Sequence, residues 1–308
     1  MMLKRIPSPI LIPKPRSFGA KNIQPGRPDG RLDGAPVSLR LDRTYIAGVL
    51  NVTPDSFSDG NKFYKLSASI PHALEMLEQG ADIIDIGGES TRPGAEPLPL
   101  KMELERVIPV IENLVRIRPD IIISIDTYKA KVAEAAIQSG ARIVNDISGL
   151  GADVEMAEVV ARYKVPLILM HIKGTPQSMQ VNPVYKNLKK EICGYFRRRI
   201  DYAVKKGIKR SQIIIDPGLG FGKKWVDNYK ILGWLDELHE LGQPVMLGPS
   251  RKSFIGKVLN LPSEQRMEGT AAVVAYAVTK GVQFVRVHDI SGIKRVIAIL
   301  EIINKYDR

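Results

Sequence analysis

The sequence predicts a (β/α)8 TIM barrel preceded by a proline-rich, basic N-terminal extension. Its 308 residues fit an α/β barrel of about 250 residues with an added segment. Beyond residue 44, short apolar runs that end in polar residues alternate with amphipathic helical patterns, as in repeated βα units. There are eight such runs, and eight parallel strands joined by right-handed helical crossovers favour a closed barrel over an open sheet.

Composition narrows the class of protein. With 44% hydrophobic and 25% charged residues, the chain resembles a globular protein able to bury a substantial core. Its apolar runs are far shorter than the roughly 20 residues that span a bilayer, so we expect no membrane segment. The single cysteine, Cys193, cannot form an internal disulfide, and prolines interrupt the start where a signal peptide would need an apolar run. Both observations favour a cytoplasmic protein.

Charge and proline content divide the chain into an extension, residues 1–36, and a barrel domain, residues 37–308. The extension holds seven prolines and seven basic residues against two aspartates, so we expect a flexible or loosely docked tail whose removal costs little stability. The formal net charge of +12 suggests a polyanionic partner. However, the densest internal basic run, 197–199, lies on a helical pattern with its own buried stripe. We interpret it as a solvated helix face and expect no nucleic-acid partner.

The strands are predicted in order from the apolar runs, and helices from the patterns between them. Val107, Ile111 and Leu114 illustrate the helical spacing. A glycine often precedes the next strand, where a left-handed residue can end a helix. The predicted strands are 46–50, 83–86, 121–125, 143–144, 167–170, 213–215, 245–247 and 284–287, and the glycines are Gly80, Gly140, Gly207, Gly242 and Gly281.

Polar side chains collect at the carboxyl ends of these strands, whereas the amino ends carry mainly glycine and small residues. A barrel enzyme places its active site at the carboxyl ends. We therefore interpret these ends as a reaction site. The polar residues there are Asn51, Asp85, Asp126, Asn145, Asp146, His171, Asp216, Ser250, Arg251, Arg286 and His288.

The loops after the first two strands carry dense polar motifs. The stretch 51–60 reads Asn-Val-Thr-Pro-Asp-Ser-Phe-Ser-Asp-Gly, and its one large apolar residue, Phe57, favours a lid over a flat ligand rather than a plain surface turn. The stretch 85–94 reads Asp-Ile-Gly-Gly-Glu-Ser-Thr-Arg-Pro-Gly. Its glycines allow close backbone approach, and Thr91 and Arg92 are donors suited to phosphate.

Carboxylate and amide side chains follow further strands. Asp126, Asn145 and Asp216 suit a ligand ring edge with paired N–H donors, although Asp126 could instead cap the following helix. The glycine-rich run after Asp216 is not a P-loop, because Pro217 and Lys224 break that motif. It is not a dinucleotide fingerprint either, because its glycines alternate.

The last two strands end in cations. Lys252 follows the seventh, and Arg286 and His288 end the eighth, where barrel enzymes commonly bind phosphate. This favours a pyrophosphate pocket, with a salt bridge as the alternative role for Arg286 and a core position for His288. His171 stays ambiguous. No spacing of ligands suits zinc, and no Ser-His-Asp arrangement emerges.

These motifs closely resemble those of the dihydropteroate synthases, folate-pathway enzymes of the pterin-binding family of TIM barrels. The resemblance spans residues 46–292 and rests on 48–60, 85–94, 216–223 and 250–253. It implies that 7,8-dihydropterin-6-ylmethyl pyrophosphate condenses with 4-aminobenzoate, with Mg²⁺ present, to give 7,8-dihydropteroate and pyrophosphate. It also implies a cytoplasmic homodimer and a sulfonamide target.

The resemblance further implies a role for each matching side chain. Pyrophosphate would leave first, and fixed negative charge would stabilise the cationic pterin methylene before the amine attacks. The implied catalytic residues are Asp126, Asp59, Lys252 and Arg286, and the pterin-binding residues are Asp126, Asn145, Asp216, Lys252 and Arg286. Pyrophosphate would contact Asn51, Thr91, Arg92, Arg286 and His288, aminobenzoate would contact Phe57, Pro93, Phe221 and Ser253, and Asn51 would lie near the metal.

Three departures from the family pattern and two alternative functions remain. Asn61 stands where a second glycine is common, Pro249 precedes the Ser-Arg-Lys-Ser stretch, and the extension is additional. The first departure puts the mobility of the lid in question. One alternative is a pterin-dependent methyltransferase acting on a corrinoid protein, which has no evident use for Phe57. The other is a non-catalytic pterin-binding protein, although no catalytic residue of the family is missing.

Overall fold

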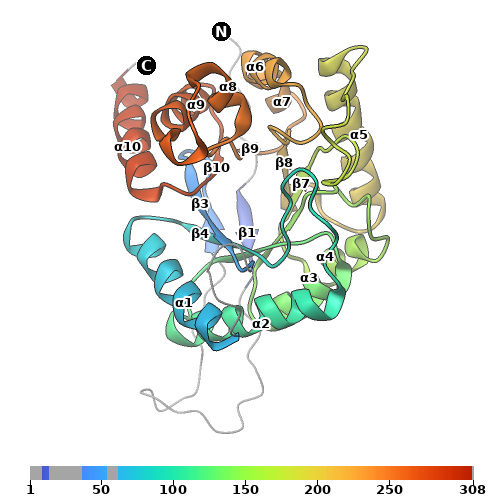
Figure 1. Cartoon of the computed structure of the whole chain (residues 1–308). Coiled ribbons are helices and arrows are strands. Elements are labelled where there is room, and N and C mark those ends of the chain that lie inside the picture. The colour runs from blue at the N-terminus through green and yellow to red at the C-terminus, as the bar shows by residue number, and fades with distance from the viewer. Residues whose placement is uncertain (1–8, 14–36, 54–61, 307–308) are drawn as a thin grey trace, which may run out of the picture.

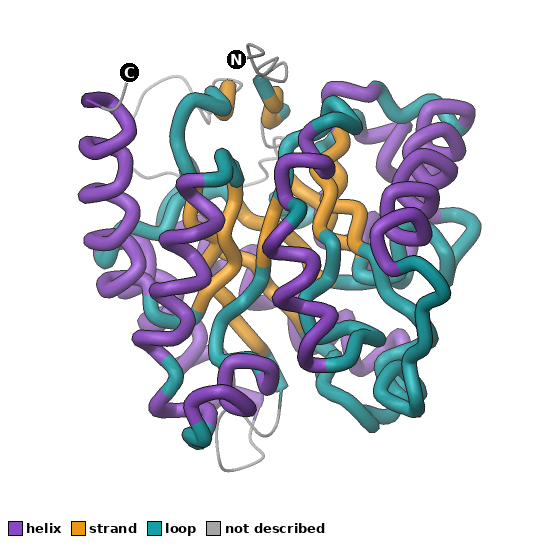
Figure 2. The backbone as a smooth tube through the Cα atoms, turned by 90° about the horizontal axis from the view of Figure 1, so that it is seen from above, coloured by secondary structure: helices purple, strands orange, loops and turns teal. Residues whose placement is uncertain are grey.

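The computed structural model describes residues 9–13, 37–53 and 62–306. Eight parallel strands pair in the order β8-β7-β6-β5-β4-β3-β10-β9. A bridge between Ile215 and Val245 joins the two ends of this order, so the sheet closes into a barrel with helices around it (Figures 1 and 2). The predicted (β/α)8 barrel is confirmed.

The elements alternate along the chain as the periodicity predicts. The barrel strands are β3 Tyr45–Asn51, β4 Ile83–Gly87, β5 Ile123–Asp126, β6 Ile143–Asp146, β7 Leu167–Met170, β8 Ile213–Asp216, β9 Met246–Leu247 and β10 Phe284–Val287. The helices are α1 Lys62–Glu78, α2 Leu100–Ile117, α3 Ala130–Gln138, α4 Met156–Tyr163, α5 Leu188–Lys205, α6 Trp225–Gly233, α7 Leu235–His239, α8 Ser253–Leu259, α9 Met267–Thr279 and α10 Ile290–Tyr306. None of the helices described here has the length and apolar character needed to span a membrane.

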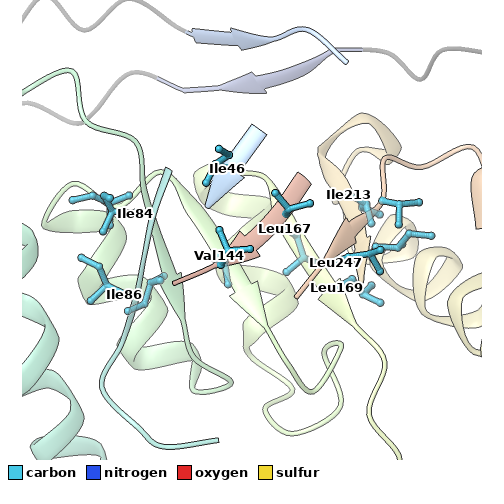
Figure 3. Packing of buried hydrophobic residues seen from close by; sticks show 14 of the residues in the cluster. Ile46, Ile84, Ile86, Val144, Leu167, Leu169, Ile213 and Leu247 are labelled. Atoms are coloured by element: carbon cyan, nitrogen blue, oxygen red, sulfur yellow. The ribbon is translucent and has the colours of Figure 1, made fainter. Parts of the chain in front are cut away.

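The barrel strands are buried on both faces. Ile143 points into the barrel, and the next residue, Val144, packs outward against the helices. Ile168 and Leu169 alternate in the same way. This period of two lets each strand contribute to the barrel interior and to the layer beneath the helices. Figure 3 shows Val144 and Leu169 within the outer cluster.

A short antiparallel pair closes the amino end of the barrel. Strand β1 (Ile10–Ile12) pairs with β2 (Val37–Leu39), and both lie above the barrel strands in Figure 3. Ile10 and Ile12 are each 0% exposed, whereas Leu11 is 62% exposed. The two buried isoleucines pack with residues at the amino ends of the barrel strands, including Tyr45 and Phe284.

Where the structure describes the extension, at residues 9–13, the chain is a docked strand and not a flexible tail. The backbone carbonyl of Pro13 also accepts a hydrogen bond of 2.9 Å from Arg142 Nε. The physical reason is the Ile-Leu-Ile alternation, which buries one face of a strand despite the surrounding prolines. For the rest of the extension, residues 1–8 and 14–36, the expectation falls outside the described residues.

Candidate active site

The carboxyl ends of the strands bring the predicted pterin-binding side chains together. Asp126 pairs in register with Gly87 on one side and with Asn145 on the other. Asp216 ends β8, where its backbone carbonyl accepts a 2.9 Å hydrogen bond from the amide of His171. Asn145 and Asp216 are buried. Parallel pairing places all of these strand ends at one mouth of the barrel.

Arg286 is the centre of a buried ionic cluster in this mouth. Its Nε donates to Asp85 Oδ2 at 2.6 Å, and its Nη2 donates to Asp126 Oδ2 at 2.8 Å. Asn145 Nδ2 donates to the same Asp85 oxygen at 3.2 Å. The other oxygen of Asp126, Oδ1, is buried without a hydrogen-bond partner among the described residues. One guanidinium thus bridges two carboxylates and leaves an acceptor unused.

The cluster decides between two alternatives that the sequence leaves open. Arg286 forms the salt bridges anticipated as its alternative role, at the carboxyl end of the barrel and with 22% of its side chain exposed. Asp126 does not cap the following helix, because the N-cap position of α3 is Lys129 and no side chain caps it. Sequence analysis placed Asp85 among the strand-end residues of the reaction site but gave it no specific role, although its place on the inner face of β4 follows from the period of two.

Burial shifts the pKa values of the groups around this cluster. Desolvation raises the pKa of Asp126 to about 7, against the opposing charge of Arg286 and with the support of Asp85. Burial also raises the pKa of Asp216, which the charge of Lys252 opposes. Burial lowers the pKa of Lys252 to about 8. Strongly shifted pKa values caused by burial and by specific charged partners are typical of functional sites.

The seventh and eighth strand ends supply the remaining cations. Lys252 Nζ donates to the carbonyl of Leu219 and lies 4.6 Å from the ring centre of Phe221. His288 Nδ1 is 2.9 Å from Ser250 Oγ. Burial, followed by the charge of Arg286, lowers the pKa of His288 to about 4. Its imidazole is therefore neutral near neutral pH.

Comparison with known proteins decides the family. Residues 47–288 match the family of pterin binding enzymes. The chain belongs to this family. Dihydropteroate synthase from Clostridium beijerinckii is 48% identical over 85% of this chain and 95% of that protein. The one from Bacillus subtilis is 45% identical over 84% of this chain and 88% of its own length.

Solved structures of the pterin-binding enzymes agree with this placement. A Yersinia pestis dihydropteroate synthase structure described as a sulfonamide drug complex has a TM-score of 0.83 and 42% identity, covering 87% of this chain and 97% of its own. The Xanthomonas albilineans enzyme in complex with 7,8-dihydropteroate has a TM-score of 0.78 and 37% identity, covering 87% and 96%. The motif resemblance is confirmed, and the activity is that of a transferase of folate biosynthesis, dihydropteroate synthase.

The loop after β4 presents the pterin-binding enzyme's predicted pyrophosphate donors. Arg92 and Pro93 are exposed and border a cavity of about 370 Å³. Thr91, between Ser90 and Arg92, is half-buried. At the base of the loop, Arg106 Nη1 donates to the carbonyl of Gly88 at 2.7 Å, and a Cβ on Gly88 would come within 2.8 Å of Val107. A glycine is therefore required there.

Two predicted site residues cannot be placed. Phe57 and Asp59, together with Asn61, lie in the segment 54–61, outside the described residues. The lid, the aromatic wall from Phe57 and the charge of Asp59 all stay predictions. Phe221 and Ser253 are described, on the loop after β8 and at the start of α8.

Sequence reasoning missed a buried ionic cluster behind the loop after β4. Lys129 Nζ pairs with both Glu89 and Glu103. Tyr128 Oη donates to Glu89 at 2.6 Å, and Thr127 Oγ1 donates to Glu103 at 2.7 Å. Glu103 is 1% exposed. The cluster ties Glu89, inside the phosphate motif, to the loop after β5; Glu103 and Lys129 carry no motif that would have revealed it.

A larger cavity, about 840 Å³, lies at the opposite end of the barrel, beside Tyr45 and Gln283. Two cations on its wall have carboxylate partners: Arg43 pairs with Asp82, and Lys280 pairs with an aspartate of α7. We assign the chemistry to the carboxyl end, since the motifs and the desolvated charges lie there.

Proposed function

We propose that the enzyme binds 7,8-dihydropterin-6-ylmethyl pyrophosphate in the mouth of the barrel and transfers the pterin methylene to the amine of 4-aminobenzoate. The observation that carries this assignment of residues is the cluster of Asp85, Asp126 and Arg286, with one buried Asp126 oxygen left without a donor. A buried acceptor without a partner costs about 1–3 kcal/mol. A pterin edge, which carries ring and amino N–H groups, would relieve that cost.

The pterin would lie between side chains of matching hydrogen-bonding type. Asp126, Asn145 and Asp216 offer acceptors from three strand ends, and Asn145 also has an amide donor. Lys252, which follows β9, and Arg286, on β10, offer donors to the same ligand. Desolvation of these groups strengthens each contact, because charges interact more strongly where water is excluded.

The bond between the pterin methylene and pyrophosphate breaks first, and pyrophosphate takes the electron pair. Thr91, Arg92, Arg286 and His288 would bind the leaving group, with neutral His288 acting as a hydrogen-bonding group. The negative charge of Asp126 would stabilise the cationic methylene, an electrostatic effect that needs no protein nucleophile. The amine nitrogen then forms the new bond and releases its proton to water.

Mg²⁺ fits the donor set if pyrophosphate and water supply most of its ligands. A Cβ on Gly87 would lie 3.7 Å from Asp126 Oδ2 and 3.8 Å from Asn51 Oδ1, so these oxygens face a common position. Within the described ranges, no group of three His, Cys, Asp or Glu side chains could hold a metal. A site with few protein ligands suits Mg²⁺, because this ion takes oxygen ligands and is commonly bound through substrate phosphates and water. Asn51 would hold the ion, which would neutralise charge on the pyrophosphate.

Aminobenzoate would lie beside the pterin, between two described walls. Pro93 comes from the loop after β4, and the half-buried ring of Phe221 comes from the loop after β8. The exposed hydroxyl of Ser253 would receive the carboxylate, and Phe57 would complete the pocket. We expect sulfonamides to compete for this position.

A second copy of the chain is the proposed partner. Helices α8, α9 and α10 pack side by side, and α10 presents exposed apolar residues at helical spacing. The exposed side chains are Val258, Leu259, Tyr276, Ile299, Ile302, Ile303 and Tyr306. Sedimentation of the purified protein tests this proposal, and a monomer at working concentrations would contradict it. We propose a cytoplasmic location on the grounds of the single cysteine, Cys193, which cannot form an internal disulfide.

The function is tested by pyrophosphate release from the purified protein with both substrates, with and without Mg²⁺. We expect release that depends on aminobenzoate and on the metal. Pterin binding without aminobenzoate-dependent turnover would favour the methyltransferase or the non-catalytic protein instead. Turnover that is unaffected by chelation would contradict the role of Mg²⁺.

A further inference from the structure

The loop after β8, residues 217–224, is held by side chains along its backbone. Four successive carbonyl groups, from residue 219 to residue 222, each accept a hydrogen bond from a different side chain. Gly220 accepts at 2.5 Å, Phe221 at 2.8 Å and Gly222 at 2.6 Å. The donors are Lys252 Nζ, Gln180 Nε2, Lys223 Nζ and Tyr185 Oη, in the order of the carbonyls from Leu219.

Lys223 is the most buried of these donors. It is 2% exposed, and its Nζ lies 2.8 Å from the carbonyl of Phe221, 3.1 Å from His171 Nδ1 and 3.3 Å from the carbonyl of His171. These contacts use the donor capacity of the lysine amino group, whose pKa burial lowers well below its usual value. His171 follows β7, so Lys223 connects the end of β7 to Phe221. Fully satisfied buried polar groups make a structure rigid.

The backbone packing leaves this loop little freedom. Gly218 and Gly222 have φ of +67° and +62°. A Cβ on Gly218 would come within 2.1 Å of the carbonyl of His171, and one on Gly222 within 2.2 Å of the carbonyl of Lys173. The loop therefore lies directly against the backbone that follows β7. Lys223 stabilises this contact by hydrogen bonds to the carbonyls of His171 and Phe221.

We infer that Lys223 is a positioning residue that holds Phe221 in place for aminobenzoate without contacting either substrate. The inference rests on the proposed function, in which Phe221 is a wall of the aminobenzoate pocket. Asp216, which serves the pterin, is held by β8 and by the amide of Gly218, which donates to its Oδ1 at 2.7 Å. Lys223 acts on Asp216 through its charge, and no hydrogen bond joins the two side chains in the described part of the chain. Loss of Lys223 should therefore release Phe221 and leave Asp216 in place.

The experiment replaces Lys223 with methionine, which keeps the length of the side chain and removes its donors. For Lys223→Met we expect the KM for aminobenzoate to rise by about tenfold, which corresponds to the loss of one well-made anchor. Affinity for the pterin substrate, measured by calorimetry, should stay within about twofold, well below the tenfold change expected for aminobenzoate. The matched control is Lys224→Met, the same chemical change in the exposed neighbouring side chain, which should leave both constants unchanged.

A second variant covers the case in which Lys223→Met does not fold. Tyr185→Phe removes only the hydroxyl that donates to Gly222, and it should raise the same KM by a smaller factor. A merely structural role would lower kcat and weaken both substrates together, which would overturn the inference, as would an unchanged KM in the folded variants. Wild-type protein without aminobenzoate-dependent turnover would overturn the proposed function itself. Wild-type turnover with an unmoved KM in the variants would overturn only the role of Lys223.

Discussion

The two ends of the barrel are built from the same strands and are filled in opposite ways. At the carboxyl end, Asp126, Lys252 and Arg286 are charged groups withdrawn from water. At the amino end, Ile10 and Phe284 belong to an apolar cluster that the extension completes. Each end thus uses burial, with opposite energetic consequences.

The difference teaches where stability and chemistry are placed in this molecule. Burying apolar surface contributes about 25 cal/mol per Å², so closing the amino end stabilises the barrel. Burying carboxylates and amines costs free energy and shifts their pKa values, as it does for Asp126 and Lys252. The amino end helps to offset what the charged end costs. Changes at the two ends should therefore have separable effects on folding and on turnover.

The largest effect is expected for Arg286→Met. It leaves Asp85 and Asp126 without their shared cation, and breaking one side of a buried ion pair typically costs about 3–5 kcal/mol. Without the cation, the pKa of Asp126 rises further above its unfolded value, so the loss should be greatest at alkaline pH and shrink as acid protonates this carboxyl group. Denaturant unfolding at several pH values measures this, and turnover should also be lost.

A matched Arg286→Lys variant keeps the charge but cannot bridge both carboxylates as a guanidinium fork does. It should recover part of the stability and little of the turnover. If the methionine variant and the wild type have equal unfolding free energies across the pH range, then leaving Asp85 and Asp126 without their cation costs no stability.

The next effect is expected for Asp126→Asn, which should separate chemistry from folding. Removing the charge opposite the cationic methylene should lower turnover by about 10²–10³-fold, the effect seen when one preorganised electrostatic group is removed. Near-wild-type turnover would refute the electrostatic role.

The stability of this variant should move the other way. Because the folded pKa of Asp126 is about 7, above its ordinary value of 3.8, the wild type loses stability as the pH rises through this interval. The amide that replaces the carboxyl group does not titrate. Above neutral pH the unfolding free energy of the variant should therefore equal or exceed that of the wild type, and the difference should shrink as the pH falls toward 3.8. Denaturant midpoints of both proteins, measured below pH 3.8 and above pH 7, test whether the stability difference has this sign.

At the amino end, Ile10→Ala should lower the free energy of unfolding with little change in KM or kcat. The expected loss lies toward the lower end of the about 2–5 kcal/mol typical of buried Ile→Ala changes, because β1 is short. Leu11→Ala, one residue away and 62% exposed in the wild type, is the matched control and should change little. Equal melting temperatures for the two variants would mean that the docked strand does not stabilise the barrel.

Whether the sequence predicts a feature of this structure depends on how far apart in the chain the interacting residues lie. The strands and the polar residues at their ends are local patterns of period and spacing, so the barrel and the shared mouth of Asp126, Asn145 and Asp216 were predictable. The docking of Ile10 was not, because three residues between prolines show too little pattern and their partner strand lies far along the chain. Lys223 likewise looks like an ordinary loop lysine until the fold places it beside His171.

The smallest effect concerns the order in which the substrates bind. It depends on a difference between two loops at the carboxyl end: side chains hold the backbone of the loop after β8, whereas the tip of the loop after β4 is exposed. Arg92 and Pro93 are exposed there. Among the described residues, the main-chain hydrogen bonds next to them run from Gly94 to Pro176 at 3.2 Å and from Ala95 to Arg92 at 3.1 Å. The same loop is expected to bind pyrophosphate through Arg92 and aminobenzoate through Pro93. Ordering it costs about 1–2 kcal/mol per residue fixed, so pyrophosphate should bind first and prepare the second pocket.

Calorimetry of aminobenzoate binding, with the free protein and then with a pterin mimic, Mg²⁺ and pyrophosphate present, measures this coupling. We expect at least about a tenfold gain in affinity, or about 1.4 kcal/mol of coupling. Arg92→Met should remove most of the gain, because it takes away the contact through which pyrophosphate orders the loop, whereas Lys101→Met, in the first turn of α2, should preserve it. Equal aminobenzoate affinity with and without pyrophosphate would mean that both loops of the mouth are already ordered, and the contrast between them would disappear.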